Sequence, residues 1–265
     1  MSNLIGDQPA LTSPPSSLSL DGELVGSVVP RTHLTTADRD RMYALLSAYF
    51  DRTERCRFEE DLAEKEAVVV LRDVNAGQIQ GFSTFQRMQI NADSRDIVAF
   101  YSGDTIVAKE YWGETILSRL WSQTVFAEAD VIRAERPATE VFWFLICSGY
   151  KTYRFLPVFF REFYPCPSCS TPCEIKRILD TLGRAKFADQ YNAKSGIVRF
   201  AQPTPLRQGV AEVTERRLND PMIAFFKSLN PGHADGDELA CITRVSRSNV
   251  TRAGARMLVV QNPIE

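Results

Sequence analysis

A short turn between a strand and a helix is the first feature of this sequence that can do chemistry. Residues 96–107 are expected to form a strand, and the residues from Gly113 onward carry apolar side chains at helical spacing. The first turn of a helix has unpaired N–H groups and the positive end of the helix dipole, which together attract anions. The turn therefore predicts a site for a phosphate or pyrophosphate. The alternative is an ordinary strand–helix corner, since glycine is also the usual turn residue.

Positive and phenolic side chains gather just after the dense apolar run at residues 139–147. This run has the length and composition of a fully buried strand, and open α/β sheets bind ligands beyond the carboxyl ends of such strands. Lys151 and Arg154 can meet an anionic substrate or a phosphate group there. Tyr150 completes the expected substrate-binding set. The alternative for the tyrosines of this segment is packing, because a tyrosine ring is amphipathic.

Three thiols lie close together further along the chain. Cys166, Cys169 and Cys173 can supply three metal ligands, with His233 or Cys241 as a fourth. A structural zinc site usually takes two paired ligand clusters, and the sequence offers one. We therefore expect a proline-rich loop with free thiols and no metal, which suits a reducing cytosol.

The elements that position these groups follow from apolar periodicity and turn residues. Thr35 or Thr36 is the expected N-cap of the first helix. Turn chemistry at residues 73–77 joins two of the strands as a hairpin. The expected order is a strand before His33, helices at 36–51 and 54–65, strands at 66–72, 78–88 and 96–107, the helix near Gly113, a strand at 139–147 and a further helix.

This order resembles the GNAT acyltransferase superfamily, which binds acyl-coenzyme A at a turn after its fourth strand. The resemblance covers roughly residues 27–165, and Val107, the pair Glu110-Tyr111 and Gly113 stand in matching places of the turn. It implies an α/β (α+β) fold with a mixed, largely antiparallel central sheet flanked by helices. It also implies acetyl-CoA or another acyl-CoA as the cofactor.

The turn departs from the family's pattern. Trp112 stands where the family has a basic or amide residue, and Thr115 and Leu117 stand where it has later small residues. Side chains at those two positions crowd a pyrophosphate, because glycines there let the backbone approach it. One alternative donor is an acyl carrier protein, whose phosphopantetheine arm has one phosphodiester. A further alternative is that the site binds no thioester at all. The donor-binding residues expected from the resemblance are Ile106, Val107, Trp112, Gly113, Glu114 and Thr115.

Acyl transfer needs a base for the acceptor and an acid for the leaving thiolate. Asp104, near the end of the strand at residues 96–107, is the expected base, and the alternative is a turn or capping aspartate. In the family, the helix after the buried strand often carries a tyrosine that acts as the acid, and Tyr153 and Tyr164 are the candidates here.

The resulting prediction is an acyltransferase that moves an acyl group from a CoA or carrier-protein thioester to an amine or hydroxyl of a small metabolite. A non-catalytic GNAT-like binding or sensing module is the alternative, favoured by the altered turn. A metal-binding protein built on the three clustered cysteines is a further alternative.

Aromatic side chains concentrate in the second half of the expected core. They form either ordinary core or an apolar tunnel for a long acyl chain or an aromatic acceptor. The residues concerned are Phe142, Trp143, Phe144, Phe155, Phe159, Phe160 and Phe163.

The composition of the chain limits the kinds of molecule that we expect it to bind. The chain has 265 residues, 44% hydrophobic and 24% charged, as in ordinary globular proteins. A formal net charge of −2 gives no basic surface for nucleic acid. The sequence contains neither an apolar run of about 18 residues nor a basic segment followed by an apolar one. We therefore expect a cytoplasmic protein without a membrane span.

Three regions are predicted along the chain. Residues 1–26 are rich in proline and serine and form an irregular leader, and residues 27–165 form the GNAT-like core. Residues 166–265 form an α/β extension that closes the sheet, covers the acceptor cleft as a lid, or mediates a homodimer. Helices are expected at residues 174–188 and 221–229, strands at 196–200 and 238–244, and a final helix at 250–257.

Overall fold

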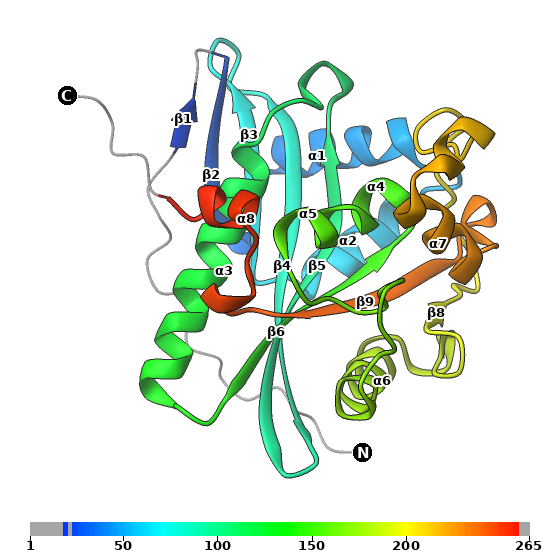
Figure 1. Ribbon diagram of the computed structural model, residues 1–265. Helices are drawn as coiled ribbons and strands as arrows, with labels where there is room; N and C mark the ends of the chain where they lie inside the picture. The colour runs from blue at the N-terminus through cyan, green and yellow to red at the C-terminus, as the bar shows by residue number, and fades with distance from the viewer. Residues whose placement is uncertain (1–17, 21–22, 260–265) are drawn as a thin grey trace.

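The structure is a computed structural model that describes residues 18–20 and 23–259 (Figure 1). Its strands are β1 (Leu18–Leu20), β2 (Leu24–Pro30), β3 (Ala67–Asp73), β4 (Ile79–Ala92), β5 (Arg95–Val107), β6 (Glu140–Cys147), β7 (Tyr191–Asn192), β8 (Ile197–Val198) and β9 (Glu238–Arg244). Its α-helices are α1 (Thr36–Tyr49), α2 (Arg55–Ala63), α3 (Ile116–Glu135), α4 (Tyr150–Tyr153), α5 (Phe155–Phe159), α6 (Cys173–Phe187), α7 (Pro221–Leu229) and α8 (Arg252–Met257).

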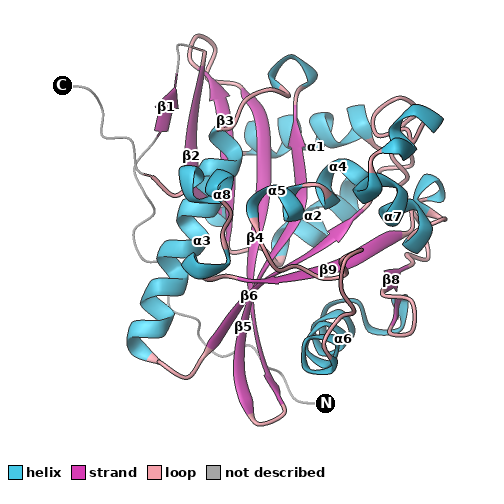
Figure 2. Ribbon diagram, viewed as in Figure 1, coloured by secondary structure: helices cyan, strands magenta, loops and turns pink. Residues whose placement is uncertain are grey.

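All of these strands belong to one sheet, in the order β1-β2-β3-β4-β5-β6-β9-β8-β7. Neighbouring strands are antiparallel except β5 and β6, which run parallel. Helices cover both faces (Figure 2). The mixed, largely antiparallel sheet flanked by helices that the sequence predicted is confirmed.

Local sequence signals explain why these elements begin and end where they do. The Thr35 side chain accepts a hydrogen bond from the Asp38 N–H, and the Asp38 carboxylate accepts one from the Thr35 N–H, so α1 starts in a capping box. Gly77 closes the β3–β4 hairpin with a φ of +66°, a conformation that glycine adopts without strain.

Two predicted boundaries differ from the structure. Part of the leader predicted at residues 1–26 is ordered, because β1 and the first residues of β2 lie within it, while residues 1–17 and 21–22 lie outside the described part. Buried residues, beginning with Leu24, alternate with partly buried ones along β2, which is the pattern of a half-buried strand. Helix α3 begins at Ile116 rather than near Gly113, because a 3-10 turn, η2 (Lys109–Tyr111), and the N-cap residue Thr115 come first.

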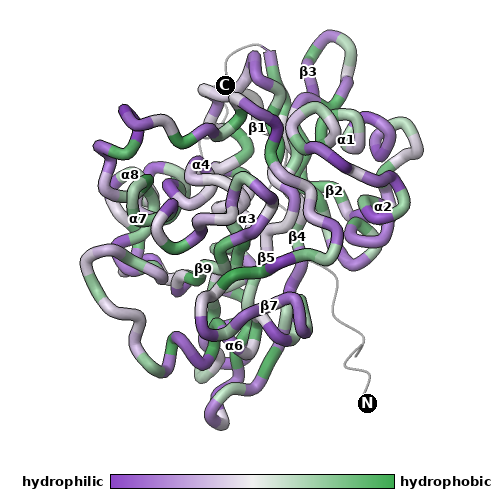
Figure 3. The backbone as a smooth tube through the Cα atoms, turned by 90° about the vertical axis from the view of Figure 1, so that its right-hand side faces the viewer, coloured by the Kyte–Doolittle hydropathy of each residue, from purple (hydrophilic) through white to green (hydrophobic). Residues whose placement is uncertain are grey.

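The two faces of the sheet carry separate hydrophobic clusters. Helices α3, α4, α5, α7 and α8 pack on one face, against residues such as Val98, Phe100 and Trp143. Helices α1, α2 and α6 pack on the other, where α6 covers Tyr101 and Phe144. Figure 3 shows hydrophobic segments in the central strands and hydrophilic ones in many outer loops. Among the described residues, no helix combines the length and hydropathy that a membrane span requires.

The described residues from 166 to 259 continue the same sheet. Strand β9 pairs with β6 from Phe142 opposite Arg244 to Cys147 opposite Leu239. Side chains of this region also join the cluster under α3 and the cluster under α6. The described part of the extension thus adds strands β9, β8 and β7 to the sheet.

Strands β5 and β6 separate before they end. Their parallel pairing stops at Ser102 opposite Leu145. Strand β5 continues along β4 to Val107, whereas β6 continues along β9 to Cys147. The sheet is therefore split beyond Ser102, and the ends of both strands border the gap.

A bulge in β5 lies at the start of this gap. Gly103 and Asp104 together oppose the single residue Thr84 of β4. A Cβ at Gly103 would lie 2.6 Å from the Thr84 hydroxyl and 3.1 Å from Lys65 Cε, so a larger residue would clash. The bulge places the Asp104 side chain at the point where the sheet splits.

Candidate functional site

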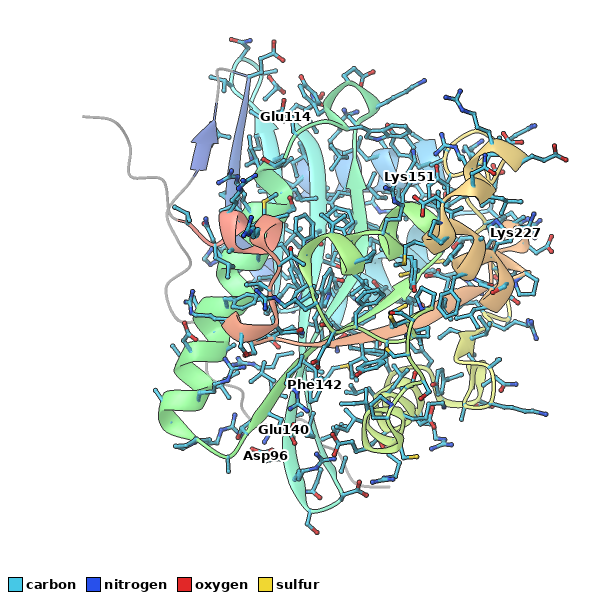
Figure 4. All side chains as sticks on the ribbon, viewed as in Figure 1. Asp96, Glu114, Glu140, Phe142, Lys151 and Lys227 are labelled. Carbon is cyan, nitrogen blue, oxygen red and sulfur yellow. The ribbon has the colours of Figure 1, made fainter. Side chains whose placement is uncertain are left out.

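A cavity of about 460 Å³ opens at the gap between β5 and β6. The end of β5, the first turns of α3, helices α4 and α5, and residues 206–211 line it. Glu114, from the turn before α3, and Lys151, from α4, both line it and are labelled in Figure 4. The split of the sheet thus provides a pocket large enough for a small molecule or an extended chain.

Aromatic rings form one wall of this cavity. The Trp121 and Trp143 rings lie 4.5 Å apart, and the Trp143 and Phe160 rings lie 5.7 Å apart. The Trp143 indole donates to the Ser102 hydroxyl at 2.9 Å, which fixes the ring beside the gap. Phe155 and Phe159 of α5 complete the wall.

The sequence left open whether the clustered aromatic residues form core or line a tunnel. In the structure some of them are core residues and others line the cavity. Phe142 and Phe144 face α6 on the other side of the sheet, because side chains alternate along β6. Phe163 is buried in the core beside Tyr153. The remaining four rings, Trp143, Phe155, Phe159 and Phe160, line the cavity.

Trp112 closes the turn that follows β5. Its indole N–H donates to the Val107 carbonyl oxygen at 2.8 Å. The Lys151 ammonium lies 3.6 Å from the centre of the Trp112 ring, a cation–π contact, and burial together with the charge of Lys109 lowers the pKa of Lys151. The Tyr49 ring lies 5.9 Å from the Trp112 ring. An aromatic ring and a cation therefore stand together at the cavity.

The N-terminus of α3 has features that favour a bound anion and features that oppose one. Thr115 is the N-cap but makes no side-chain cap, and Ser118 donates to its carbonyl oxygen at 2.9 Å. Glu114 lines the cavity at the same end of the helix, and its negative charge opposes an anionic ligand. A Cβ at Gly113 would meet nothing within 4 Å, so this glycine is not required for close packing.

Two carboxyl groups stand on the opposite face of the split. Asp104 comes from the bulge in β5 and Glu238 from the first residue of β9, the strands that flank the end of β6. Burial and the charge of Asp61 raise the pKa of Asp104 to about 7, against the opposing charge of Lys65. Burial, together with the charges of Asp104 and Asp61, raises the pKa of Glu238 to about 8, although a hydrogen bond with Ser148 opposes the shift.

Asp61, whose charge affects both Asp104 and Glu238, forms ion pairs with two lysines. The Lys65 ammonium lies 2.6 Å from the Asp61 carboxylate and the Lys186 ammonium 3.9 Å from it. Both ammonium groups lie over the Tyr101 ring, at 5.3 and 5.2 Å from its centre. Burial lowers the pKa of Lys65 in spite of its ion pair.

Ser148 connects the two faces of the split. It follows β6, lines the cavity and hydrogen-bonds with Glu238. Ser148 therefore links the cavity to the carboxyl group of Glu238 on the other face of the sheet. With pKa values of about 7 and about 8, Asp104 and Glu238 can exchange a proton with a bound molecule near neutral pH.

Not all of the site residues predicted from sequence line the cavity. Asp104 lies at the bulge in β5, and Gly113 and Thr115 lie in the turn before α3 without lining the cavity. Those at the cavity are Ile106, Val107, Trp112, Glu114 and Lys151.

The two predicted acids and two of the predicted substrate-binding residues lie elsewhere. Tyr153 is 0% exposed, and its hydroxyl donates to the Pro165 carbonyl oxygen at 2.9 Å. Tyr164 pairs with Ile242 and borders a smaller pocket beside α6. Tyr150 is buried, and Arg154 pairs with Asp220 at 3.4 Å.

Sequence reasoning missed Glu238, the aromatic wall at Trp121 and the lining segment 206–211. An acidic residue at the start of a predicted strand was visible in the sequence, but its position beside Asp104 depends on how β9 pairs with β6.

The three clustered cysteines lie between α5 and α6 and at the start of α6. Among the described residues, no group of three or more His, Cys, Asp or Glu side chains could hold a metal ion. Cys166 and Cys169 face each other in an isolated β-bridge, and Cys173 is exposed at the start of α6. His233 packs against the Phe226 ring at 5.6 Å and contacts the Asn230 carbonyl oxygen through its Nδ1 atom.

Comparison with known proteins gives matches among solved structures alone. No protein-family model matches this chain, and no curated protein matches it. A conserved protein of Enterococcus faecalis, described as a probable N-acyltransferase, is 17% identical with a TM-score of 0.38. That match covers 52% of this chain and 33% of the Enterococcus protein, so this chain spans about a third of its length.

Two further similar structures are acetyltransferases. An acetyltransferase of Trypanosoma brucei is 15% identical with a TM-score of 0.34, and the match covers 50% of this chain and 87% of that one. The GNAT family N-acetyltransferase YhbS of Escherichia coli, in complex with CoA, is 18% identical with a TM-score of 0.33, covering 52% and 71%. These are proteins of the kind that the sequence resemblance names. At such TM-scores they add no weight to a functional conclusion, which depends on the geometry of this chain.

Proposed function

We propose that this protein is an acyltransferase that moves an acyl group from a thioester of coenzyme A to an amine or hydroxyl of a small metabolite. The observation that carries the proposal is the split of the sheet beyond Ser102, with a cavity on one face and two carboxyl groups of raised pKa on the other. Donor and acceptor can approach this gap from opposite sides, as a direct transfer between them requires.

The residues of the cavity suit the acyl-bearing arm of a donor better than its phosphates. The aromatic wall at Trp121, Trp143 and Phe160 favours an apolar chain and excludes water from it. Lys151 supplies a positive charge, whereas Glu114 opposes an anion at the N-terminus of α3. Bound coenzyme A thioester would supply the activated acyl group, and an acyl carrier protein is the alternative source of the same arm.

Asp104 is our candidate base, with Glu238 beside it. A carboxylate with a pKa near 7 is ionised in a large fraction of molecules at neutral pH and is still basic enough to take the acceptor's proton. Because the charge of Asp104 raises the pKa of Glu238, Glu238 holds its proton while Asp104 is ionised. The pair can thus receive one proton without placing two charges in the gap.

A non-catalytic binding module is the second candidate. The hydrogen bond from Trp112 to Val107 favours it, because it occupies the carbonyl oxygen of a residue that the resemblance places among the donor-binding residues. Such a module would bind the ligand in the same cavity but would not transfer the acyl group.

The test is a melting experiment on purified protein with coenzyme A, acetyl-CoA and a long-chain acyl-CoA, followed by mass spectrometry of mixtures with amine and alcohol acceptors. A ligand at 100 times its dissociation constant adds about 2.7 kcal/mol to the stability of the folded state. Ser118→Trp should fill the cavity mouth and remove the shift, whereas Ser118→Ala, which removes a hydroxyl alone, should keep it. A shift with acyl product supports transfer, and a shift without product supports the module. No shift with any of these ligands rejects coenzyme A as the donor.

A further inference from the structure

The segment between α5 and α6 carries a pair of cysteines that the proposed acyl transfer does not use. Cys166 and Cys169 face each other across an isolated antiparallel β-bridge, with Pro167 and Ser168 forming the turn between them. Directly opposed residues of an antiparallel pair have Cα atoms about 4.5–5.5 Å apart, within the range of about 4.4–6.8 Å that a disulfide spans. The backbone thus already holds the two residues at the separation of a disulfide.

The surroundings of Cys166 favour its thiolate form. Its sulfur lies 3.0 Å from the Ser168 hydroxyl. Partial burial opposes the charged form, but hydrogen bonds from the Ser168 hydroxyl and N–H and from the Cys169 thiol and N–H lower the pKa of Cys166. Converging donors of this kind stabilise the anion that acts as a nucleophile.

Cys169 is suited to the second role in the pair. Its side chain is exposed, and its thiol hydrogen-bonds to Cys166, which raises the pKa of Cys169. Cys169 therefore keeps its proton while Cys166 is a thiolate. Cys166 can therefore attack as a thiolate, and Cys169 lies next to it as the thiol for the second step of the exchange.

We propose that Cys166 and Cys169 form a thiol–disulfide exchange site whose substrates are low-molecular-weight disulfides, with Cys166 as the attacking thiol and Cys169 as the resolving thiol. The proposal is independent of acyl transfer, because none of the residues that carry it lines the cavity.

The proposed thiol–disulfide exchange has two steps. The Cys166 thiolate attacks one sulfur of a disulfide RSSR, the S–S bond breaks, and one RS⁻ leaves. Cys169 then loses its proton to solvent and attacks the Cys166 sulfur, so the mixed disulfide breaks and the second RS⁻ leaves. The two cysteines are oxidised by two electrons, and RSSR is reduced to two thiols.

The chain provides its own controls for reactivity. Cys56 in α2 and Cys173 at the start of α6 are also exposed, and neither lies opposite a second cysteine in a β-bridge. Cys147 and Cys241 are fully buried, with sulfurs 3.8 Å apart, and should stay unreactive in the folded protein. Differences among these six thiols report local chemistry rather than general exposure.

The experiment treats the full chain with glutathione disulfide at pH 7 and follows each cysteine by peptide mass spectrometry. We expect Cys166 to react about tenfold faster than Cys56 and Cys173, and the product to be an internal Cys166–Cys169 disulfide. Equal rates at the three sites in the wild-type protein, or a mixed glutathione adduct that persists, would overturn the proposal.

Variants separate the two roles. In Cys169→Ser the glutathione adduct at Cys166 should accumulate, because no thiol is left to resolve it, and in Cys166→Ser the fast reaction should disappear. Ser168→Ala should shift the pH at which Cys166 becomes reactive upward, because it removes one donor to the sulfur. Unchanged pH dependence in Ser168→Ala and a rapidly resolved adduct in Cys169→Ser would each contradict the assignment. A melting curve of each variant checks that it is folded.

Discussion

The indole N–H of Trp112 donates a hydrogen bond to the carbonyl oxygen of Val107 at 2.8 Å, across the turn that joins β5 to α3. This contact gives a structural reason for a tryptophan at a position where the family resemblance expects a basic or amide side chain. The ring bridges the end of the strand to the cavity, where Lys151 stacks on it. Trp112 thus stabilises the turn through contacts within the chain.

Trp112→Phe isolates the contribution of this hydrogen bond. Phenylalanine keeps a ring beside Lys151 but has no N–H for the Val107 carbonyl. We expect the free energy of unfolding to fall by about 0.5–1.5 kcal/mol, the usual net value of one such hydrogen bond. Urea denaturation of both proteins measures the difference. A variant as stable as the wild type would mean that water replaces the indole at no cost.

Lys151→Met tests whether the cation at the cavity attracts the donor's phosphates. Lys151 lines the cavity, whereas Arg154, three residues later, pairs with Asp220 and does not line it. We expect Lys151→Met to weaken binding of acyl-CoA about tenfold, which corresponds to about 1.4 kcal/mol, and Arg154→Met to leave it unchanged. Titration calorimetry at two salt concentrations measures both. Equal losses in the two variants would point to a general charge effect rather than a site at Lys151.

Much of the framework follows from local sequence signals. The β-branched run that became β3, the capping box at Thr35 and the glycine turn of the β3–β4 hairpin each specify their own structure within a few residues. The apolar stripe of α3 likewise predicts a buried helix, although its first residue is set by the η2 turn that precedes it.

The site depends on contacts that no local pattern encodes. Glu238 reaches the gap because β9 pairs antiparallel to β6, and its raised pKa arises from burial and from Asp104 on another strand. Asp104 itself was identifiable as a candidate because it lies near the end of a predicted strand, but the bulge that places it follows from pairing with β4. The roles assigned to tyrosines by analogy are the weakest predictions, because a hydroxyl in a core helix and one in a pocket look alike in sequence.

Tyr153→Phe tests a structural role for the buried hydroxyl. The Tyr153 hydroxyl donates to the Pro165 carbonyl, and the ring packs against Phe226 at 5.8 Å, away from the cavity. Removing the hydroxyl should lower the free energy of unfolding by about 1–3 kcal/mol, because it leaves a partly buried acceptor without its donor. Turnover should stay within about twofold of the wild type at a temperature where both are folded. A large loss of turnover with unchanged stability would restore Tyr153 as an acid.

Tyr164→Phe is the matched control for that experiment. Tyr164 borders the smaller pocket beside α6 and contacts Ile242 through its backbone. Its hydroxyl should be dispensable, with stability changed by less than about 0.5 kcal/mol and turnover unchanged. A loss of turnover specific to Tyr164→Phe would move the reaction to the α6 side of the sheet.

Asp104 should control how both activity and stability depend on pH. Activity should rise as pH increases through about 7, where Asp104 ionises, and Asp104→Asn should lose this dependence together with about 100-fold or more of the rate. Glu238→Gln should keep the rise near 7, because Asp61 rather than Glu238 is the charge that raises the pKa of Asp104.

Stability gives an independent readout of the same group. The folded state raises the pKa of Asp104 from 3.8 to about 7, so between these values the folded protein binds more protons than the unfolded chain. The contribution of Asp104 to stability must therefore fall as pH rises through this window. Asp104→Asn, which cannot ionise, should gain stability relative to the wild type between pH 5 and pH 8. If the difference between the two proteins is the same at both pH values, Asp104 ionises normally, and its assignment as the base is wrong.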